Sequence, residues 1–126
     1  MNNLKVKRYI EKADRYITQA EKEFKKGELC QASEKYWGAS AQILKAWAEY
    51  KGIQHNGHIW LFKAADELAE EIKEPAIRKQ FSLASALHMN FYEGWLTERE
   101  VRDDAFEVKL FCDKIKQILT NKEEKK

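Results

Sequence analysis

Apolar residues recur every three or four positions along nearly the whole chain. In the first segment they stand at Val6, Ile10 and Ala13 and continue in this way to Phe24. Since an α-helix has about 3.6 residues per turn, this spacing gathers the apolar side chains on one helix face. The same pattern predicts five helices, at about residues 4–25, 28–50, 58–73, 75–94 and 98–119. The chain is therefore predicted to be all-α.

The breaks between these segments predict the topology. Gly27 ends the first helix, Pro75 opens the fourth, and Thr97 with Glu100 has the form of a capping box. Helices of about 22 residues extend roughly 33 Å, and short connections make consecutive helices antiparallel. We therefore expect an up-and-down bundle of four to five helices, with the short third helix inserted at one end. Residues 1–120 form its single domain, and the polar residues 121–126 are expected to fray in solvent.

Composition and the two cysteines narrow the class of protein. The chain has 23 Lys and Arg against 21 Asp and Glu, which gives a net charge of +2. The totals alone therefore do not indicate a positive electrostatic potential that would attract nucleic acid. No stretch approaches the roughly 18 apolar residues that a membrane span needs, and no apolar signal segment opens the chain. Cys30 and Cys112 stand at apolar helix positions, which favours buried, reduced thiols. A cytoplasmic location is expected.

One polar side chain interrupts the apolar seam of the fourth helix. His88 is expected to face inward, either as a hydrogen-bonded structural group or as an acid, base or ligand. The structural interpretation is the commoner one for buried polar groups. Asn90, Tyr92 and Glu93 follow directly, and Ser40 is a polar residue on the seam of the second helix. The seam predicts a polar locus near the end of the fourth helix, although solvation alone also explains Asn90 and Glu93.

Neither a metal site nor a catalytic group is predicted from the motifs. His55 and His58 form an H-x-x-H pair, and together with His88 they would supply three nitrogen ligands for zinc. No acidic residue adjoins the pair, however, and no H-E-x-x-H motif occurs. Cys30 has only carboxylates as charged neighbours, which disfavours a nucleophilic thiolate. No Gly-rich phosphate loop and no G-x-S-x-G motif is present. We expect no cofactor.

Cations and aromatic residues are mixed along the second helix. Lys35, Lys45 and Lys51 accompany Trp37 and Trp47, a combination suited to stacking bases and contacting phosphates. Aromatic residues at seam spacing more often belong to the core, with the lysines on the solvent face. Both interpretations stay open, and the second is favoured.

Two blocks of sequence resemble the archaeal PaREP family. The first is Gly27-Glu28 followed by residues 31–39, QASEKYWGA, and the second is residues 87–93, LHMNFYE, which looks like a signature of that family. With His58, the resemblance covers nearly the whole chain. It implies a bundle similar to the HEPN superfamily, whose members bind nucleotides and are often homodimers and often ribonucleases.

The ribonuclease motif of that superfamily does not occur here. It consists of an arginine followed four to six residues later by a histidine, whereas nine residues separate Arg78 from His88 and no histidine follows Arg99 or Arg102. The resemblance therefore implies a homodimer that binds a nucleotide or RNA, without a recognisable catalytic motif. The residues expected to bind are Lys35, Ser40, His58, His88, Asn90, Tyr92 and Glu93.

The alternative belongs to a different class of protein. In it the chain is a protein-interaction or structural helical subunit with no small-molecule site, His88 is a core residue, and exposed Trp60 or Trp95 anchors a protein partner. A concave polar pocket near His88 would favour the first hypothesis, and an apolar patch around the tryptophans the second.

Overall fold

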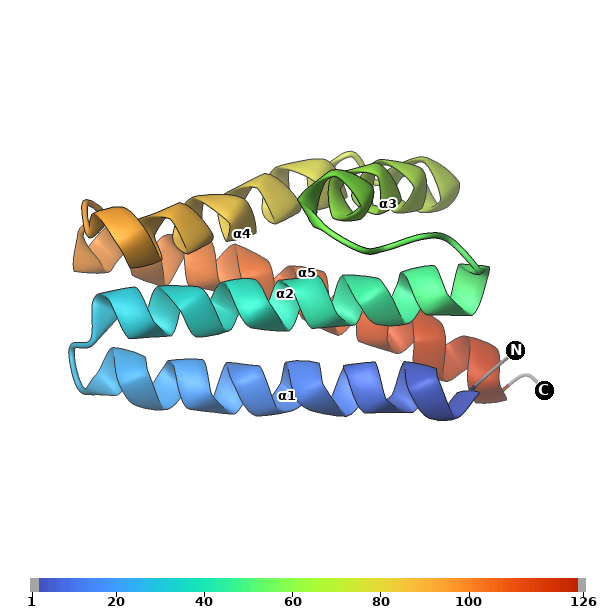
Figure 1. Ribbon diagram of the computed structural model, residues 1–126, viewed down its shortest axis with the longest axis horizontal. Helices are drawn as coiled ribbons and strands as arrows, with labels where there is room; N and C mark the ends of the chain where they lie inside the picture. Colours follow the sequence, from blue (N-terminus) through green and yellow to red (C-terminus); the bar gives the residue numbers. More distant parts are fainter. Residues whose placement is uncertain (1–2, 125–126) are drawn as a thin grey trace.

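The computed structural model describes residues 3–124, and within that range it contains five α-helices and no strand (Figure 1). The helices are α1 (Asn3–Lys25), α2 (Leu29–Lys51), α3 (His58–Ile72), α4 (Ala76–Glu93) and α5 (Glu98–Glu124). The predicted all-α bundle is confirmed, and the helices begin close to their predicted positions. None of the described helices is long and apolar enough to cross a membrane.

The helical backbone of α5 extends a few residues beyond the predicted end near residue 119, to Glu124. Residues 125–126 lie outside the described part of the chain, and fraying of residues 121–126 in solvent stays a prediction. Leu119 is still buried, so it anchors the last turns, and the Lys and Glu residues that follow are good helix formers.

α2 lies at the centre of the bundle and contacts each of the other four helices. Its contact with α1 is especially close at Gly38, where an added Cβ would lie 3.1 Å from Cδ2 of the Tyr16 ring. A side chain at this position would force the ring to move. Glycine therefore sets the position of Tyr16 beside α2.

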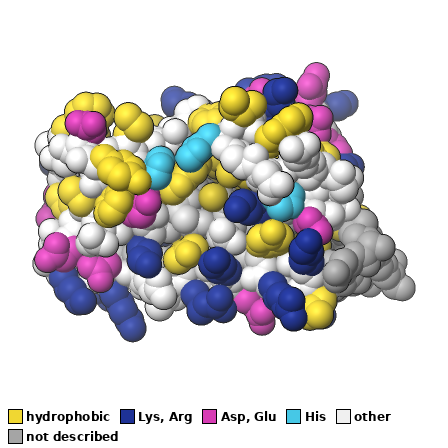
Figure 2. All heavy atoms as spheres, viewed as in Figure 1, with side chains coloured by type: hydrophobic (Ala, Val, Ile, Leu, Met, Phe, Trp, Pro, Cys, Tyr) yellow, Lys and Arg dark blue, Asp and Glu magenta, His cyan; other side chains and the backbone are white. Residues whose placement is uncertain are grey.

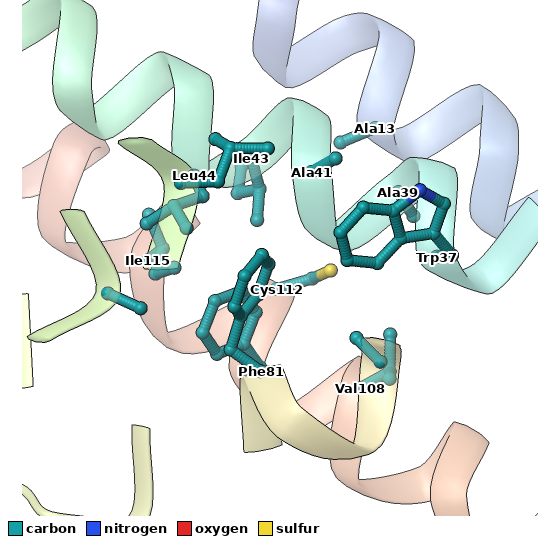
Figure 3. Close-up of a cluster of buried hydrophobic side chains, with 14 of the residues drawn as sticks. Ala13, Trp37, Ala39, Ala41, Ile43, Leu44, Phe81, Val108, Cys112 and Ile115 are labelled. Carbon is teal, nitrogen blue, oxygen red and sulfur yellow. The ribbon is translucent and has the colours of Figure 1, made fainter. Parts of the chain in front are cut away.

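The core lies where α2, α4 and α5 meet. Trp47, Phe81 and Phe111 are fully buried, and Figure 3 shows Phe81 near Leu44 and Ile115, which come from α2 and α5. Each such side chain contributes about 1.5–3 kcal/mol when it is removed from water. Packing of this kind, more than helix propensity, holds the bundle together.

Local signals fix where the helices end. Gly52 and Gly94 adopt left-handed conformations after α2 and α4 (φ 73° and 66°), which glycine reaches without steric cost. At the start of α5, the Thr97 amide donates to Glu100 Oε1 at 2.9 Å and the Glu100 amide donates to Thr97 Oγ1 at 3.1 Å. The predicted capping box is confirmed.

The loop between α2 and α3 determines where the short third helix begins. It turns back over the bundle, so α3 starts beside the middle of α2 and packs against α4 (Figure 1). The first residue of α3, His58, is thereby brought against Trp37 of α2. This placement creates the candidate site.

Candidate functional site

Three rings from three helices form one cluster. The Trp37 and His58 rings stack with centroids 5.1 Å apart and planes 6° apart, and the Trp37 and His88 rings stack at 5.1 Å and 28°. His58 and His88 also stack on each other at 5.3 Å. The cluster therefore joins α2, the start of α3 and the second half of α4.

A carboxylate orients the His88 imidazole. His88 Nδ1 lies 2.7 Å from Oε1 of Glu34, and both side chains are largely buried, at 20% and 30% exposure. An ionised carboxylate only accepts hydrogen bonds, so Nδ1 donates and Nε2 is left as the acceptor nitrogen of the neutral ring. The predicted inward-facing His88 is thus a half-buried, hydrogen-bonded residue.

A hollow of about 340 Å³ opens beside this cluster, between α1, α2 and the start of α3. We refer to it as the α2–α3 hollow. Figure 2 shows the histidine side chains exposed on this face of the molecule, with hydrophobic and cationic side chains around them. Its lining consists of Tyr16, Glu34, Lys35, Trp37, Gly38, Ala41, Gln42, Lys45, Gly57, His58 and Leu61.

The hollow favours an anionic ligand. Lys35 and Lys45 line it, and Lys35 Nζ lies 5.2 Å from the centre of the Tyr16 ring. The first turn of α3 also borders the hollow, since Gly57, His58 and Leu61 line it. Gly57 precedes this helix and has no side chain to cap its amide groups. Amide groups of an uncapped first turn carry partial positive charge and bind anions. Two lysines and a helix start thus outweigh the one lining carboxylate, Glu34.

One buried polar side-chain atom in the lining has no hydrogen-bond partner among the described residues. Gln42 Oε1 is buried and accepts no hydrogen bond from the described residues. Since a buried unpaired carbonyl costs about 1–3 kcal/mol, a donor supplied by a ligand or by water would stabilise this side chain.

The predicted binding residues separate into two groups. Lys35 and His58 line the hollow, and His88 adjoins it through its stack with His58. Tyr92 packs edge-on against His88, with centroids 5.4 Å apart, and remains 69% exposed. Glu93 is exposed at the end of α4.

Ser40 and Asn90 lie inside the bundle and do not line the hollow. Ser40 Oγ donates to the Trp37 carbonyl oxygen of its own helix at 2.7 Å. Asn90 Nδ2 donates to Ser33 Oγ at 3.0 Å, and Asn90 Oδ1 accepts from the Leu96 amide at 2.8 Å. Both amide ends of Asn90 are therefore used to join α4 to α2 and to the turn before α5.

Comparison with known proteins supplies the family. The model of the archaeal PaREP1/PaREP8 family matches residues 8–112. The chain belongs to this family. Among solved structures, the crystal structure of a Sulfolobus solfataricus protein is similar, with 27% identity over 86% of this chain and 96% of that chain and a TM-score of 0.76. Comparison with curated proteins gives no match.

Several lining residues of this PaREP1/PaREP8 chain were not among those predicted from the sequence. Glu34, Gly38, Ala41 and Lys45 recur at helical spacing along one face of α2. The mixture of Lys45 and Trp37 was recognised, but the core interpretation was favoured. Trp37 is indeed buried, and it also lines the hollow.

The third histidine of this PaREP1/PaREP8 chain lies apart from the ring cluster. His55 Nε2 lies 3.0 Å from Glu49 Oε2, and the His55 ring packs edge-on against Tyr9 of α1. Among residues 4–121, whose side chains the structure describes, no group of three His, Cys, Asp or Glu is placed to hold a metal ion. The three histidines therefore do not form one ligand set.

Proposed function

We propose that this chain binds a nucleotide or RNA in the α2–α3 hollow. The observation that supports this best is the combination of an exposed imidazole face, His58, backed by Trp37, with Lys35 and Lys45 in one lining. A base stacked on His58 and a phosphate between the lysines and the start of α3 would satisfy both chemistries. Stacking of a base on an aromatic side chain contributes about 1–3 kcal/mol.

The proposal has further parts. We propose that the chain is a member of the HEPN-like superfamily, in keeping with its all-helical bundle, and that it forms a homodimer in the cytoplasm. Binding is proposed without a bond-breaking step, because the Arg/His motif of the superfamily's ribonucleases is not found at His88. Glu34 and His88 then act as a support that holds the ring cluster in place.

Fluorescence polarisation with a labelled single-stranded RNA, and competition by adenosine monophosphate, test the proposal. His58→Ala is expected to weaken binding by about 5- to 100-fold through lost stacking. Lys45→Gln is expected to weaken it for all sequences and to lower the salt slope by about 1. Lys79→Gln, an exposed cation on α4, is the matched control and should leave affinity unchanged. Absence of binding, or equal losses in all three variants, contradicts the proposal.

A second candidate is a protein-interaction or structural subunit. It is favoured by exposed apolar side chains at and after the end of α4, where Met89, Tyr92 and Trp95 are 47%, 69% and 62% exposed. Trp60, by contrast, is only 36% exposed, and Lys63 Nζ lies over its ring, 4.6 Å from the ring centre. Exposed large aromatics of this kind are enriched among interface hot spots.

RNA binding, measured beside sedimentation, separates the two candidates. If the chain is an interaction subunit with Trp95 in the interface between copies, Trp95→Ala should convert a dimer to a monomer, and the natural protein should bind neither RNA nor adenosine monophosphate. If the hollow is the functional site, His58→Ala should weaken RNA binding and leave the association state unchanged.

A further inference from the structure

A second hollow lies between α1 and α5, away from the ring cluster. It has a volume of about 160 Å³ and is lined by Glu21, Phe24, Lys25, Tyr36, Arg102, Ala105 and Lys109. We refer to it as the α1–α5 hollow. Tyr36 follows Lys35 on α2, yet it is turned toward α5, so the two hollows open on different sides of α2.

The hydroxyl of Tyr36 is a polar group without a partner at the base of this hollow. The residue is 3% exposed, and its hydroxyl makes no hydrogen bond to the residues whose side chains the structure describes, 4–121. Burial, and then the nearby Glu21 carboxylate, raise the pKa of Tyr36 to about 12. The hydroxyl therefore stays protonated and can donate a hydrogen bond. The hydroxyl is not among the fully buried polar atoms that lack a partner, so it reaches solvent at the hollow that Tyr36 lines, where a ligand can supply the acceptor.

The charges around the hydroxyl favour an anionic acceptor. Lys25, Arg102 and Lys109 face one lining carboxylate, Glu21, which is already held by Lys109 Nζ at 3.1 Å. The Arg102 guanidinium donates to Glu98 at 2.8 Å, but that pair is exposed and weak. Arginine binds carboxylates with two parallel hydrogen bonds, so Arg102 is the residue best suited to bind an anionic carboxylate in this hollow.

The remaining lining favours an apolar body on the ligand. Phe24 is partly buried, its ring lies 6.0 Å from the Arg102 guanidinium carbon, and Ala105 is buried beside it. We infer that the α1–α5 hollow binds a small organic carboxylic acid. Its carboxylate is held by Arg102 and the Tyr36 hydroxyl, and its apolar part rests on Phe24 and Ala105. This site is independent of the α2–α3 hollow and of nucleotide binding.

Benzoate is the probe for this site, with neutral benzamide and inorganic phosphate as comparisons. In an amide-resolved NMR titration, benzoate should shift the signals of Arg102, Ala105 and Lys109 saturably, benzamide should bind at least about 10-fold more weakly, and phosphate should bind more weakly than benzoate. Tyr36→Phe removes one oxygen atom and should weaken benzoate binding about 10-fold or more, because hydrogen bonds to charged groups are the strong ones.

Two controls keep the result interpretable. Tyr36→Phe removes no hydrogen bond to described residues, so it should fold with an unchanged melting temperature. Tyr9→Phe and Arg8→Gln, which lie outside this hollow, should leave benzoate affinity unchanged. Absence of a saturable benzoate shift, benzoate affinity that survives both Tyr36→Phe and Arg102→Gln, or phosphate binding as tight as benzoate binding overturns the inference.

Discussion

Replacement of Asn90 by alanine tests whether this residue is structural or belongs to a ligand site. The side chain is 1% exposed, and it joins α4 to α2 through Ser33 and to the turn before α5 through the Leu96 amide. Asn90→Ala removes both hydrogen bonds and leaves the partly buried Leu96 N–H without an acceptor. In the account given above, all of this cost falls on folding and none on ligand binding.

The magnitude follows from the lost partners. Two neutral hydrogen bonds contribute about 0.5–1.5 kcal/mol each, and a donor left unpaired adds about 1–3 kcal/mol. Ser33 Oγ is less affected, because it still donates to the Leu29 carbonyl oxygen at 2.7 Å. We therefore expect the free energy of unfolding to fall by about 2–6 kcal/mol, a large share of the roughly 5–15 kcal/mol typical of a domain. At roughly 4 °C per kcal/mol for a domain of this size, the melting temperature should fall by about 8–24 °C.

Urea unfolding followed by circular dichroism measures this change. Asn121→Ala, an exposed amide on α5, is the matched control and should stay within about 0.5 kcal/mol of the natural protein. A double-mutant cycle with Ser33→Ala should give a coupling energy of about 0.5–1.5 kcal/mol between Asn90 and Ser33. A loss below about 1 kcal/mol, together with weaker RNA binding at a temperature where the variant is folded, would refute the structural assignment.

Three further predictions concern other parts of the chain. The hydrogen bond from His55 lowers the pKa of Glu49 below its ordinary value of 4.5. The ionised Glu49 therefore stabilises the folded state fully above that pH, and this contribution is lost as the pH falls through the folded-state pKa. Glu49→Gln should accordingly flatten the decline of melting temperature between about pH 5 and 3. Burial raises the pKa of the Cys112 thiol, so a thiol reagent should modify the partly exposed Cys30 first and Cys112 only on unfolding. Thr97→Ala should cost about 1 kcal/mol of stability through the lost cap of α5, measured by urea unfolding.

Each of these predictions has a result that contradicts it. An acid-unfolding profile unchanged by Glu49→Gln would mean that the hydrogen bond with His55 does not shift the carboxyl group in solution. Modification of both thiols at equal rates in the native protein would show that Cys112 is accessible. A Thr97→Ala variant as stable as the natural protein would show that Glu100 caps the helix without the hydroxyl.

The fold was largely predictable because its signals are local. Spacing of three and four residues places Val101, Val108 and Ile115 on one face of α5, and all three are fully buried. Local rules also located the capping box. Polarity alone placed the end of α5 near residue 119, whereas helix-forming residues continue the helical backbone to Glu124, beyond the buried Leu119.

The site was predicted only in part because its contacts join distant segments. Glu34 and His88 are 54 residues apart in sequence, and their meeting depends on how α4 crosses α2. Asn90 follows His88 closely in sequence, so proximity along the chain suggested a shared site, yet the helical rotation turns Asn90 into the bundle and toward Ser33. The α2–α3 hollow lies beside α2 and the start of α3, with Lys35 and His58 in its lining, while a polar binding locus near the end of α4 stays a prediction.

An amide-resolved NMR titration with adenosine monophosphate tests most directly whether the α2–α3 hollow is the binding site. The account predicts the largest shifts at Gly57 and His58 and along the face of α2 that carries Lys35 and Lys45, with no comparable change at Trp95. Shifts confined to the end of α4, or no shifts at all under conditions where the protein is folded, would contradict it.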